Sequence, residues 1–261
     1  MNELRIAVHG GLISFRALFN WLHPAVYVPT LLGKSALQLV FFALLGRFAG
    51  VADDRYFVVG NAVQASATLG VYGMVMVLAN ERELGTLSAV LATPANRLAL
   101  FGGRAIPVVI HGVFVSAFAF TVGWLLLDMP VPARALPALA AVTVITAVSG
   151  ALFGLALGSL ALRLRDLWVG SNLAYFLMLL LCGAAVPVSA LPHWLGAIAQ
   201  CIPLTHGIEA ARRVAAGAPP STVVGLVSVE VALGLAYGLL GYGLLCLFEA
   251  EGRRQSTLDR R

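Results

Sequence analysis

Apolar runs of about 20 residues recur along this chain, and they constrain its fold more than any other feature of the sequence. A run of that length crosses the hydrocarbon core of a bilayer, about 30 Å thick, as an α-helix. Lipid offers no hydrogen bonds to the backbone, and uninterrupted apolar runs satisfy their own amides as helices rather than as barrel strands. Only 11% of the residues are charged, against about 25% in soluble domains. The sequence therefore predicts an all-α, polytopic membrane protein.

Six of these runs are long enough to span, and we place them in one transmembrane domain, 25–261. The predicted spans are about 25–46, 57–79, 105–127, 135–162, 168–186 and 222–248. An even number of spans puts both termini on one side of the membrane. With the termini inside, the inner segments hold eleven of the 17 basic residues, the outer segments hold five, and Lys34 lies within the first span. This bias predicts a multi-pass plasma-membrane protein with a cytoplasmic N-terminus and a cytoplasmic tail, 249–261.

The first 24 residues have a different pattern. Apolar side chains recur at helical spacing from Leu4 to Leu22, while Arg5, His9 and Arg16 follow a narrow polar stripe beside them. A helix of this kind lies in the membrane interface with its polar stripe toward water. We therefore predict an N-terminal interfacial amphipathic helix over 1–24.

Several polar residues fall within the predicted spans. A charge at membrane depth costs at least about 2.5–3.5 kcal/mol, so Lys34 needs an explanation. It could line a water-filled path with Gln38, it could snorkel to the membrane interface, or it could pair with a carboxylate such as Glu230 in the sixth span. Polar residues of the second and fifth spans give further candidates for the path: Asn61, Gln64, Asn172 and Tyr175. For each of these, hydrogen bonding between helices is the alternative.

A charged segment follows the second span: "ANERELGTLSAVLATPANR", residues 79–97. Leu84, Leu87 and Leu91 share one helical face, and acids precede them, where the dipole of a new helix would favour negative charge. Pro94 disfavours helical geometry in the residue before it, so the helix would end there. This pattern predicts a short amphipathic helix, about 80–95, on the cytoplasmic side.

The outer segment 183–221 is apolar but rich in proline, which forbids one continuous helix. Irregular backbone at membrane depth must be buried in protein or line a cavity. The segment carries five candidate residues, of which Glu209 and Arg212 are expected to pair: Pro187, Pro192, Trp194, Glu209 and Arg212.

Two motifs, in this order, give the chain a resemblance to the transmembrane permease subunits of type-two ABC exporters. "NERELGTLSAVLATPANR" is similar to the coupling-helix region of that family. "CGAAVPVSALPHWLGAIAQCIPLTHGIEAAR", residues 182–212, resembles its late signature. The N-terminal "FRALFNWLHPAVYVPTLLG" is similar to the interfacial helix that leads into the first span of the family.

The resemblance implies a function for these segments. The short helix would dock in a cleft of a separate ATPase, with these residues at or near the contact: Glu81, Arg82, Glu83, Gly85, Thr86, Thr93, Pro94 and Arg97. The outer segment would form a re-entrant helix pair after the fifth span, and the five candidate residues there would belong to an outer gate. The expected cargo is a small hydrophobic or amphiphilic compound such as a drug or lipid. A lipid-linked polysaccharide or peptide is the alternative.

The chain is not expected to bind and hydrolyse ATP itself. Gly33, Lys34 and Ser35 match the tail of a phosphate-binding loop, but Val28 stands where that motif requires glycine. ATP and Mg²⁺ are thus expected on the partner, an ABC ATPase present in two copies, beside a second permease copy or a homologous permease, within membrane lipid. We expect no catalytic residue, no metal site and no nucleic-acid partner. An intramembrane enzyme and an ATP-independent channel are the alternatives of another class.

Overall fold

The computed structural model describes residues 24–50, 54–83, 85, 97–127, 131–161 and 167–255. Within these ranges every regular element is helical, which confirms the predicted all-α class. Five helices are long and apolar enough to cross a membrane: Val28–Phe48, Asp54–Glu83, Leu100–Leu127, Ala133–Leu160 and Pro220–Phe248. They correspond to the first, second, third, fourth and sixth predicted spans.

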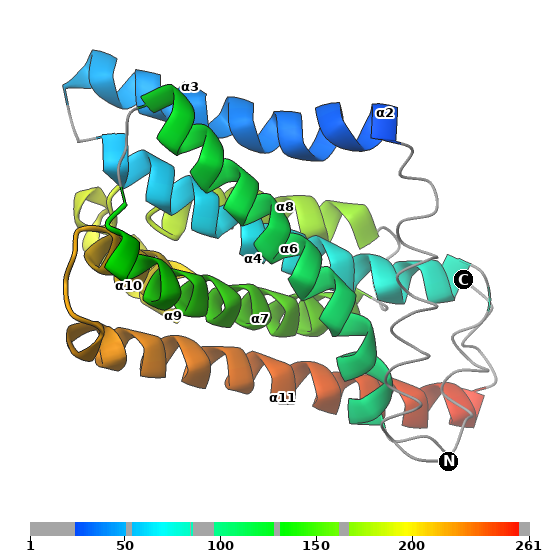
Figure 1. Ribbon diagram of the computed structural model, residues 1–261. Helices are drawn as coiled ribbons and strands as arrows, with labels where there is room; N and C mark the ends of the chain where they lie inside the picture. The colour runs from blue at the N-terminus through cyan, green and yellow to red at the C-terminus, as the bar shows by residue number, and fades with distance from the viewer. Residues whose placement is uncertain are drawn as a thin grey trace.

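The long helices run back and forth along one bundle (Figure 1). Helix α2 (Pro24–Tyr27) continues through a π-helical segment (Val28–Gly33) into α3 (Lys34–Ala49). The other long helices are α4 (Asp54–Glu83), α6 (Arg97–Leu127), α7 (Leu136–Ala161) and α11 (Val224–Gln255). The last turn of α4 and the first turn of α6 lie at the right-hand end in Figure 1, and the α3–α4 turn lies at the other end.

Helix α4 forms the centre of the bundle and packs against α3, α6, α7, α8 and α10. In its most apolar 18-residue segment 67% of the residues are buried, against 11% in Val28–Phe48 and 17% in Pro220–Phe248. The helix ends where Gly85 takes a left-handed conformation with φ +66°, the usual stop for an α-helix. Polar residues on α4 can therefore face the protein interior, while α3 and α11 remain largely uncovered by the described residues.

A ridge of glycines on α7 explains how closely α4 and α7 approach. A Cβ added at Gly150 would lie 2.6 Å from the carbonyl oxygen of Ala67, and one at Gly154 would lie 2.6 Å from that of Val71. Backbone atoms cannot yield at such distances, so only glycine fits. Small residues four apart allow this approach in membranes, and the spacing of Gly150, Gly154 and Gly158 in the sequence indicates it.

The fifth predicted span differs from the helix observed there. Helix α8 runs over Leu167–Leu181, five residues short of the predicted end at 186. It ends before Gly183, whose φ of +82° breaks the helix although the apolar run continues. The described apolar part of α8, Asn172–Leu181, is shorter than a membrane-crossing helix. The count of six spans stays a prediction.

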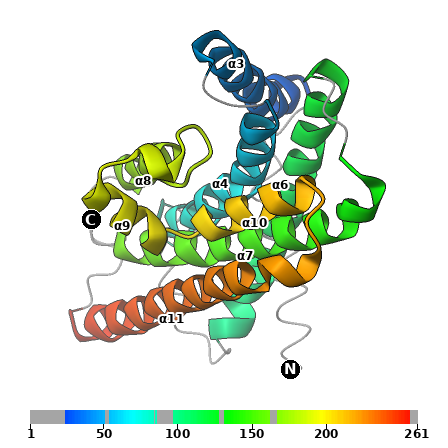
Figure 2. The same ribbon diagram turned by 90° about the vertical axis from the view of Figure 1, so that its left-hand side faces the viewer.

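Two short helices occupy the proline-rich segment after α8: α9 (His193–Cys201) and α10 (Thr205–Ala215). Figure 2 shows them at the end of the bundle that faces the viewer, with α10 against α4, α7 and α11. Pro192 directly precedes α9, and Leu204, with φ +90°, precedes α10. A positive φ costs a leucine about 1–3 kcal/mol, so the surrounding contacts must hold it.

The carboxylate of Glu230 on α11 supplies these contacts. It is fully buried and accepts the backbone amides of Leu204, at 2.9 Å, and Gly207, at 3.1 Å. The suggested pairing of Lys34 with Glu230 is therefore wrong, because Glu230 binds the junction of α9 and α10 instead.

Other predictions fall near or beyond the described residues. The last turn of α4 contains Glu81, Arg82 and Glu83. The prediction that these acids lie in the first turn of a new helix, where its dipole favours them, is therefore wrong. Arg97 begins α6. Residues 1–23 of the interfacial helix, and Thr86, Thr93 and Pro94 of the coupling helix, lie outside the described residues.

Candidate transport cavity

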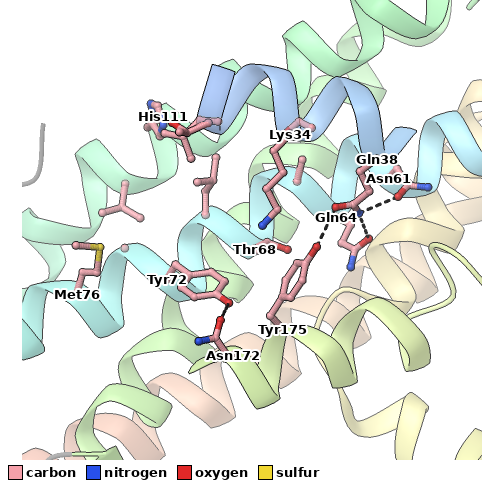
Figure 3. Close-up of a pocket in the computed structure, with 17 residues that line it drawn as sticks. Lys34, Gln38, Asn61, Gln64, Thr68, Tyr72, Met76, His111, Asn172 and Tyr175 are labelled. Atoms are coloured by element: carbon pink, nitrogen blue, oxygen red, sulfur yellow. Dashed lines mark hydrogen bonds between the residues drawn. The ribbon is translucent and has the colours of Figure 1, made fainter. Parts of the chain in front are cut away.

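A cavity of about 390 Å³ opens between α3, α4 and α8, with α6 contributing at one side (Figure 3). All six residues proposed from the sequence as path candidates line it: Lys34, Gln38, Asn61, Gln64, Asn172 and Tyr175. They come from three helices that are far apart in the sequence. Its volume lies in the range of small-molecule sites, about 300–1,000 Å³.

One stripe of α4 forms the floor of the cavity. Asn61, Gln64, Thr68 and Tyr72 follow one another at intervals of three, four and four residues, which places them on the same helical face. Asn61 and Gln64 are almost fully buried, with 3% and 1% of their surface exposed. Polar side chains at membrane depth avoid lipid and face the bundle interior, and this stripe does so.

Gln38 connects all three helices. Its Nε2 donates to Oδ1 of Asn61 at 3.0 Å, with a longer contact of 3.5 Å to Oε1 of Gln64. Its Oε1 accepts the hydroxyl of Tyr175 at 2.9 Å. Hydrogen bonds between membrane helices contribute about 0.6 kcal/mol each on average, so the network orients these side chains more than it stabilises the fold.

Lys34 is the charged residue of the cavity. Its Nζ lies 4.5 Å from the centre of the Tyr175 ring, a cation–π contact, and Figure 3 shows the amino group pointing inward between Tyr175 and Thr68. Such a contact stabilises a cation by about 0.5–2 kcal/mol, less than the cost of at least about 2.5–3.5 kcal/mol at membrane depth. The described lining residues contain no carboxylate that could neutralise it.

Two donors in the wall of the cavity lack partners among the described residues. They are Nε2 of Gln64, whose Oε1 contacts Gln38, and the hydroxyl of Thr68. A buried donor without a partner costs about 1–3 kcal/mol. Both atoms are inaccessible in this arrangement, so water or a ligand reaches them only when neighbouring side chains shift.

Two lining residues, Tyr72 and His111, are not among the candidates proposed from the sequence. The Tyr72 hydroxyl donates to Oδ1 of Asn172 at 2.8 Å, and the rings of Tyr72 and Tyr175 lie 6.0 Å apart. Nδ1 of His111 lies 3.3 Å from the hydroxyl oxygen of Tyr27. The helical stripe from Asn61 through Thr68 would have located Tyr72, whereas nothing in the local sequence of α6 connects His111 with this cavity.

An ion pair joins α4 and α6 near the C-terminal end of α4. Nη1 of Arg104 on α6 lies 2.7 Å from Oε1 of Glu81, and both side chains are largely buried, with 10% and 19% exposed. The pair ties the last turn of α4 to α6.

The residues of the predicted outer gate lie near α9 and α10 at the other end of the bundle. Pro187 precedes a 3₁₀ turn (Val188–Ala190), Pro192 precedes α9, and Trp194 is exposed. The expected pair of Glu209 with Arg212 is wrong, because Glu209 binds Arg213, four residues on, at 2.9 Å.

Arg212 points into the bundle instead of along the surface of α10. Its guanidinium donates to the carbonyl oxygens of Tyr56, at 3.0 Å, and Gly183, at 2.7 Å, and it stacks on the Tyr56 ring. It thereby joins α10 to α4 and to the turn after α8.

No cluster of potential metal ligands is found within the described part of the chain.

Comparisons with known proteins relate the chain to a family of transporters. The sequence model of the ABC-2 type transporter family matches residues 12–215. Two relatives, each named "Probable multidrug ABC transporter permease YbhR", come from Escherichia coli K12 and E. coli O157:H7. Each is 28% identical over 163 residues, which cover 62% of this chain and 44% of the relative. The aligned part thus spans less than half the length of these relatives.

Proposed function

The chain belongs to the ABC-2 type transporter family, and we propose that it is the permease subunit of an exporter driven by ATP hydrolysis in a separate subunit. The observation that carries the proposal is the polar cavity between α3, α4 and α8, together with the family match over residues 12–215. A small amphiphilic compound would enter this cavity from the cytoplasm or the inner leaflet and leave on the outer side.

The size and lining of the cavity support a small cargo. Tyrosine rings and apolar side chains such as Leu69 and Met76 surround a few polar groups, as in sites for drug-sized molecules. The name of the E. coli relatives refers to multidrug transport. Both observations favour a drug-like or lipid-like compound over a long polymer.

ATP binding would act on the segment between α4 and α6. In this proposal six spans place both termini in the cytoplasm, and residues 80–95 dock into the ATPase. The residues expected at this contact begin at Glu81, which Arg104 holds to α6. Closure of the ATPase subunits would then move α4 and α6 as a unit, and with them the floor of the cavity. Packed interfaces with two arrangements can amplify such small shifts.

The complete exporter would contain two permeases and two ATPase subunits. Helix α3 supports this, since only 11% of its apolar segment is buried while Lys34 and Gln38 project from it into the cavity. The helices α9 and α10 would close the outer end as a re-entrant pair, with Pro187 and Pro192 setting their entry and Trp194 at the membrane interface.

Cross-linking tests the ATPase contact directly. A photoreactive group on the Thr86→Cys variant is expected to capture a subunit that hydrolyses ATP and carries a phosphate-binding loop. The matched control is Ser221→Cys, an exposed position between α10 and α11. Equal capture at both positions, or no ATPase captured at residue 86, would contradict the proposal.

A further inference from the structure

The charge balance of the cavity indicates what it binds. Lys34 is the only lysine in the chain, since the other 16 basic residues are arginines. Its ammonium group enters a cavity whose described lining residues include amides, hydroxyls, aromatic rings and one histidine, but no carboxylate. The cavity therefore has a net positive character that no described acid balances.

The hydrogen-bond donors in the cavity point to the same conclusion. Within the network Oε1 of Gln38 accepts from Tyr175, and Oδ1 of Asn61 accepts from Gln38. The acceptors are thus engaged, whereas the amide nitrogen of Gln64 and the hydroxyl of Thr68 have no partner among the described residues. Figure 3 shows the Thr68 hydroxyl and the Lys34 amino group directed toward the same part of the cavity. A cation beside engaged amide oxygens and a hydroxyl that is able to donate matches a ligand that supplies acceptors.

The remaining walls indicate the body of the ligand. The rings of Tyr72 and Tyr175 lie 6.0 Å apart and tilted by 53°, and Leu31, Leu69 and Val108 add apolar surface. We infer that the compound handled by this permease is an anionic amphiphile, whose carboxylate, sulfonate or phosphate binds Lys34 while its aromatic or aliphatic part packs against the tyrosines and the apolar wall. This inference rests on the proposed function, because it assumes that the cavity receives the cargo.

The position of Lys34 also suggests a reason for lysine rather than arginine. A guanidinium would stack flat on the Tyr175 ring, whereas the compact ammonium keeps three rotatable donors for a ligand. Lys34 is thus a specificity-determining residue, and its contact with Tyr175 would hold the ammonium in place while the cavity is empty.

Two probes with the same ring skeleton test the inference. The anionic probe is 8-anilinonaphthalene-1-sulfonate, and its neutral counterpart is N-phenyl-1-naphthylamine. Dissociation constants are measured with the full-length chain in phosphatidylcholine nanodiscs at pH 8, where a histidine such as His111 is ordinarily neutral. The anionic probe is expected to bind at least about 10-fold more tightly, the effect of one ion pair in partly dry surroundings.

Three variants separate charge from packing. Lys34→Met keeps most of the length of the side chain, removes the charge and is expected to abolish the preference without changing the affinity for the neutral probe. Lys34→Arg keeps the charge but stacks on Tyr175, and it should retain only part of the preference for the anionic probe. Arg55→Met, at an exposed basic residue near the start of α4, is the control and should bind like the parent chain. Thermal unfolding of each variant checks that it is folded.

The only lysine gives an independent readout. Acylation by an amine-selective reagent, followed at Lys34 by mass spectrometry, should slow in the presence of the anionic probe and not the neutral one. Replacing part of the phosphatidylcholine by phosphatidylglycerol then distinguishes two sources of the anion. Competition by this lipid would identify a phospholipid headgroup, and its absence a soluble compound.

Equal affinities for the two probes, a preference that survives in Lys34→Met, or no saturable binding of either probe would overturn the inference. The assay needs no ATPase, so its failure is distinct from failure of the proposed function. Lys34-dependent binding without any ATP-driven transport would leave the ligand class intact and refute the exporter.

Discussion

The hydroxyl of Tyr175 on α8 donates to Oε1 of Gln38 on α3 at 2.9 Å, across 137 residues of sequence. Gln38 in turn donates to Asn61 on α4. Three helices that line the cavity are therefore joined through one amide side chain, and a change in any of them would alter the shape of the proposed path.

Replacing Tyr175 by phenylalanine tests this connection. The substitution removes the hydrogen bond to Gln38 but keeps the ring beside Lys34, and it is expected to cost about 0.6 kcal/mol of stability, the average for such bonds in membranes. The loss should appear as a small fall in unfolding temperature and as faster hydrogen exchange in α8. Leu173→Met, at an exposed position of the same helix, is the control and should leave both unchanged.

The glycine ridge predicts a larger effect. In Gly154→Ala the new Cβ would lie 2.6 Å from the Val71 carbonyl oxygen, so α4 and α7 must move apart. Overpacking of this kind costs about 1–3 kcal/mol. Gly243→Ala on α11 places its Cβ in open space and should leave stability unchanged or raise it by a fraction of a kcal/mol. Comparable unfolding temperatures for the two variants would refute the close approach of these helices.

Glu230 is expected to hold the junction of α9 and α10. Glu230→Gln loses the charge and one acceptor for the amides of Leu204 and Gly207, and hydrogen bonds to charged groups contribute about 1.5–3 kcal/mol. The exposed Cys201 at the end of α9 reports on the junction, and its labelling by maleimides should accelerate as the junction loosens.

The control for Glu230 is another acid in the same region. Glu209 binds Arg213 on an exposed surface of α10, where an ion pair contributes about 0.3–0.5 kcal/mol. Glu209→Gln should therefore leave the stability and the labelling of Cys201 nearly unchanged. Equal effects of the two substitutions would show that burial of Glu230 has no special role.

The ion pair of Glu81 with Arg104 predicts coupling between two helix ends. Arg104→Glu leaves two acids in a largely buried place and is expected to destabilise the chain by about 3–5 kcal/mol. Exchanging both residues, Glu81→Arg with Arg104→Glu, should restore much of the stability. Additive losses in this double-mutant cycle would mean that the two side chains do not interact.

Cysteine labelling tests the orientation of the chain. The proposed topology places Cys201 on the outer side and residue 86 in the cytoplasm. A membrane-impermeant maleimide should then label Cys201 in intact cells, whereas Thr86→Cys, made in a Cys201→Ser background, should react only after the cells are opened. Labelling of residue 86 from outside would reverse the topology.

Much of the cavity could be predicted from the sequence for one physical reason. Polar side chains such as Asn61 and Gln64 are costly in lipid, so they had to face other helices, and all six candidates do line one cavity. The helical spacing of Asn61, Gln64 and Thr68 on α4 also leads to Tyr72 on the same face. Hydropathy also located the long helices, because apolar length is a property of the sequence alone.

Most of the errors concern the partners of residues, and one concerns the end of a helix. Spacing along α10 allows Glu209 to reach either Arg212 or Arg213, and only the packing of α10 on α4 decides which arginine points inward. The partners of Glu230 are backbone amides exposed by the unusual conformation of Leu204, which no pattern of residue types reveals. The end of α8 was misplaced because Gly183 breaks the helix within an apolar run.

We propose that ATP, consumed by a partner subunit, drives a compound through the cavity at Lys34. Uptake of 8-anilinonaphthalene-1-sulfonate into inside-out vesicles containing the permease and its ATPase tests it most directly. We expect accumulation against a gradient that requires ATP and the ATPase and that falls at least about 10-fold in Lys34→Met, consistent with one lost ion pair. Accumulation that persists without ATP, or without the ATPase subunit, would contradict it.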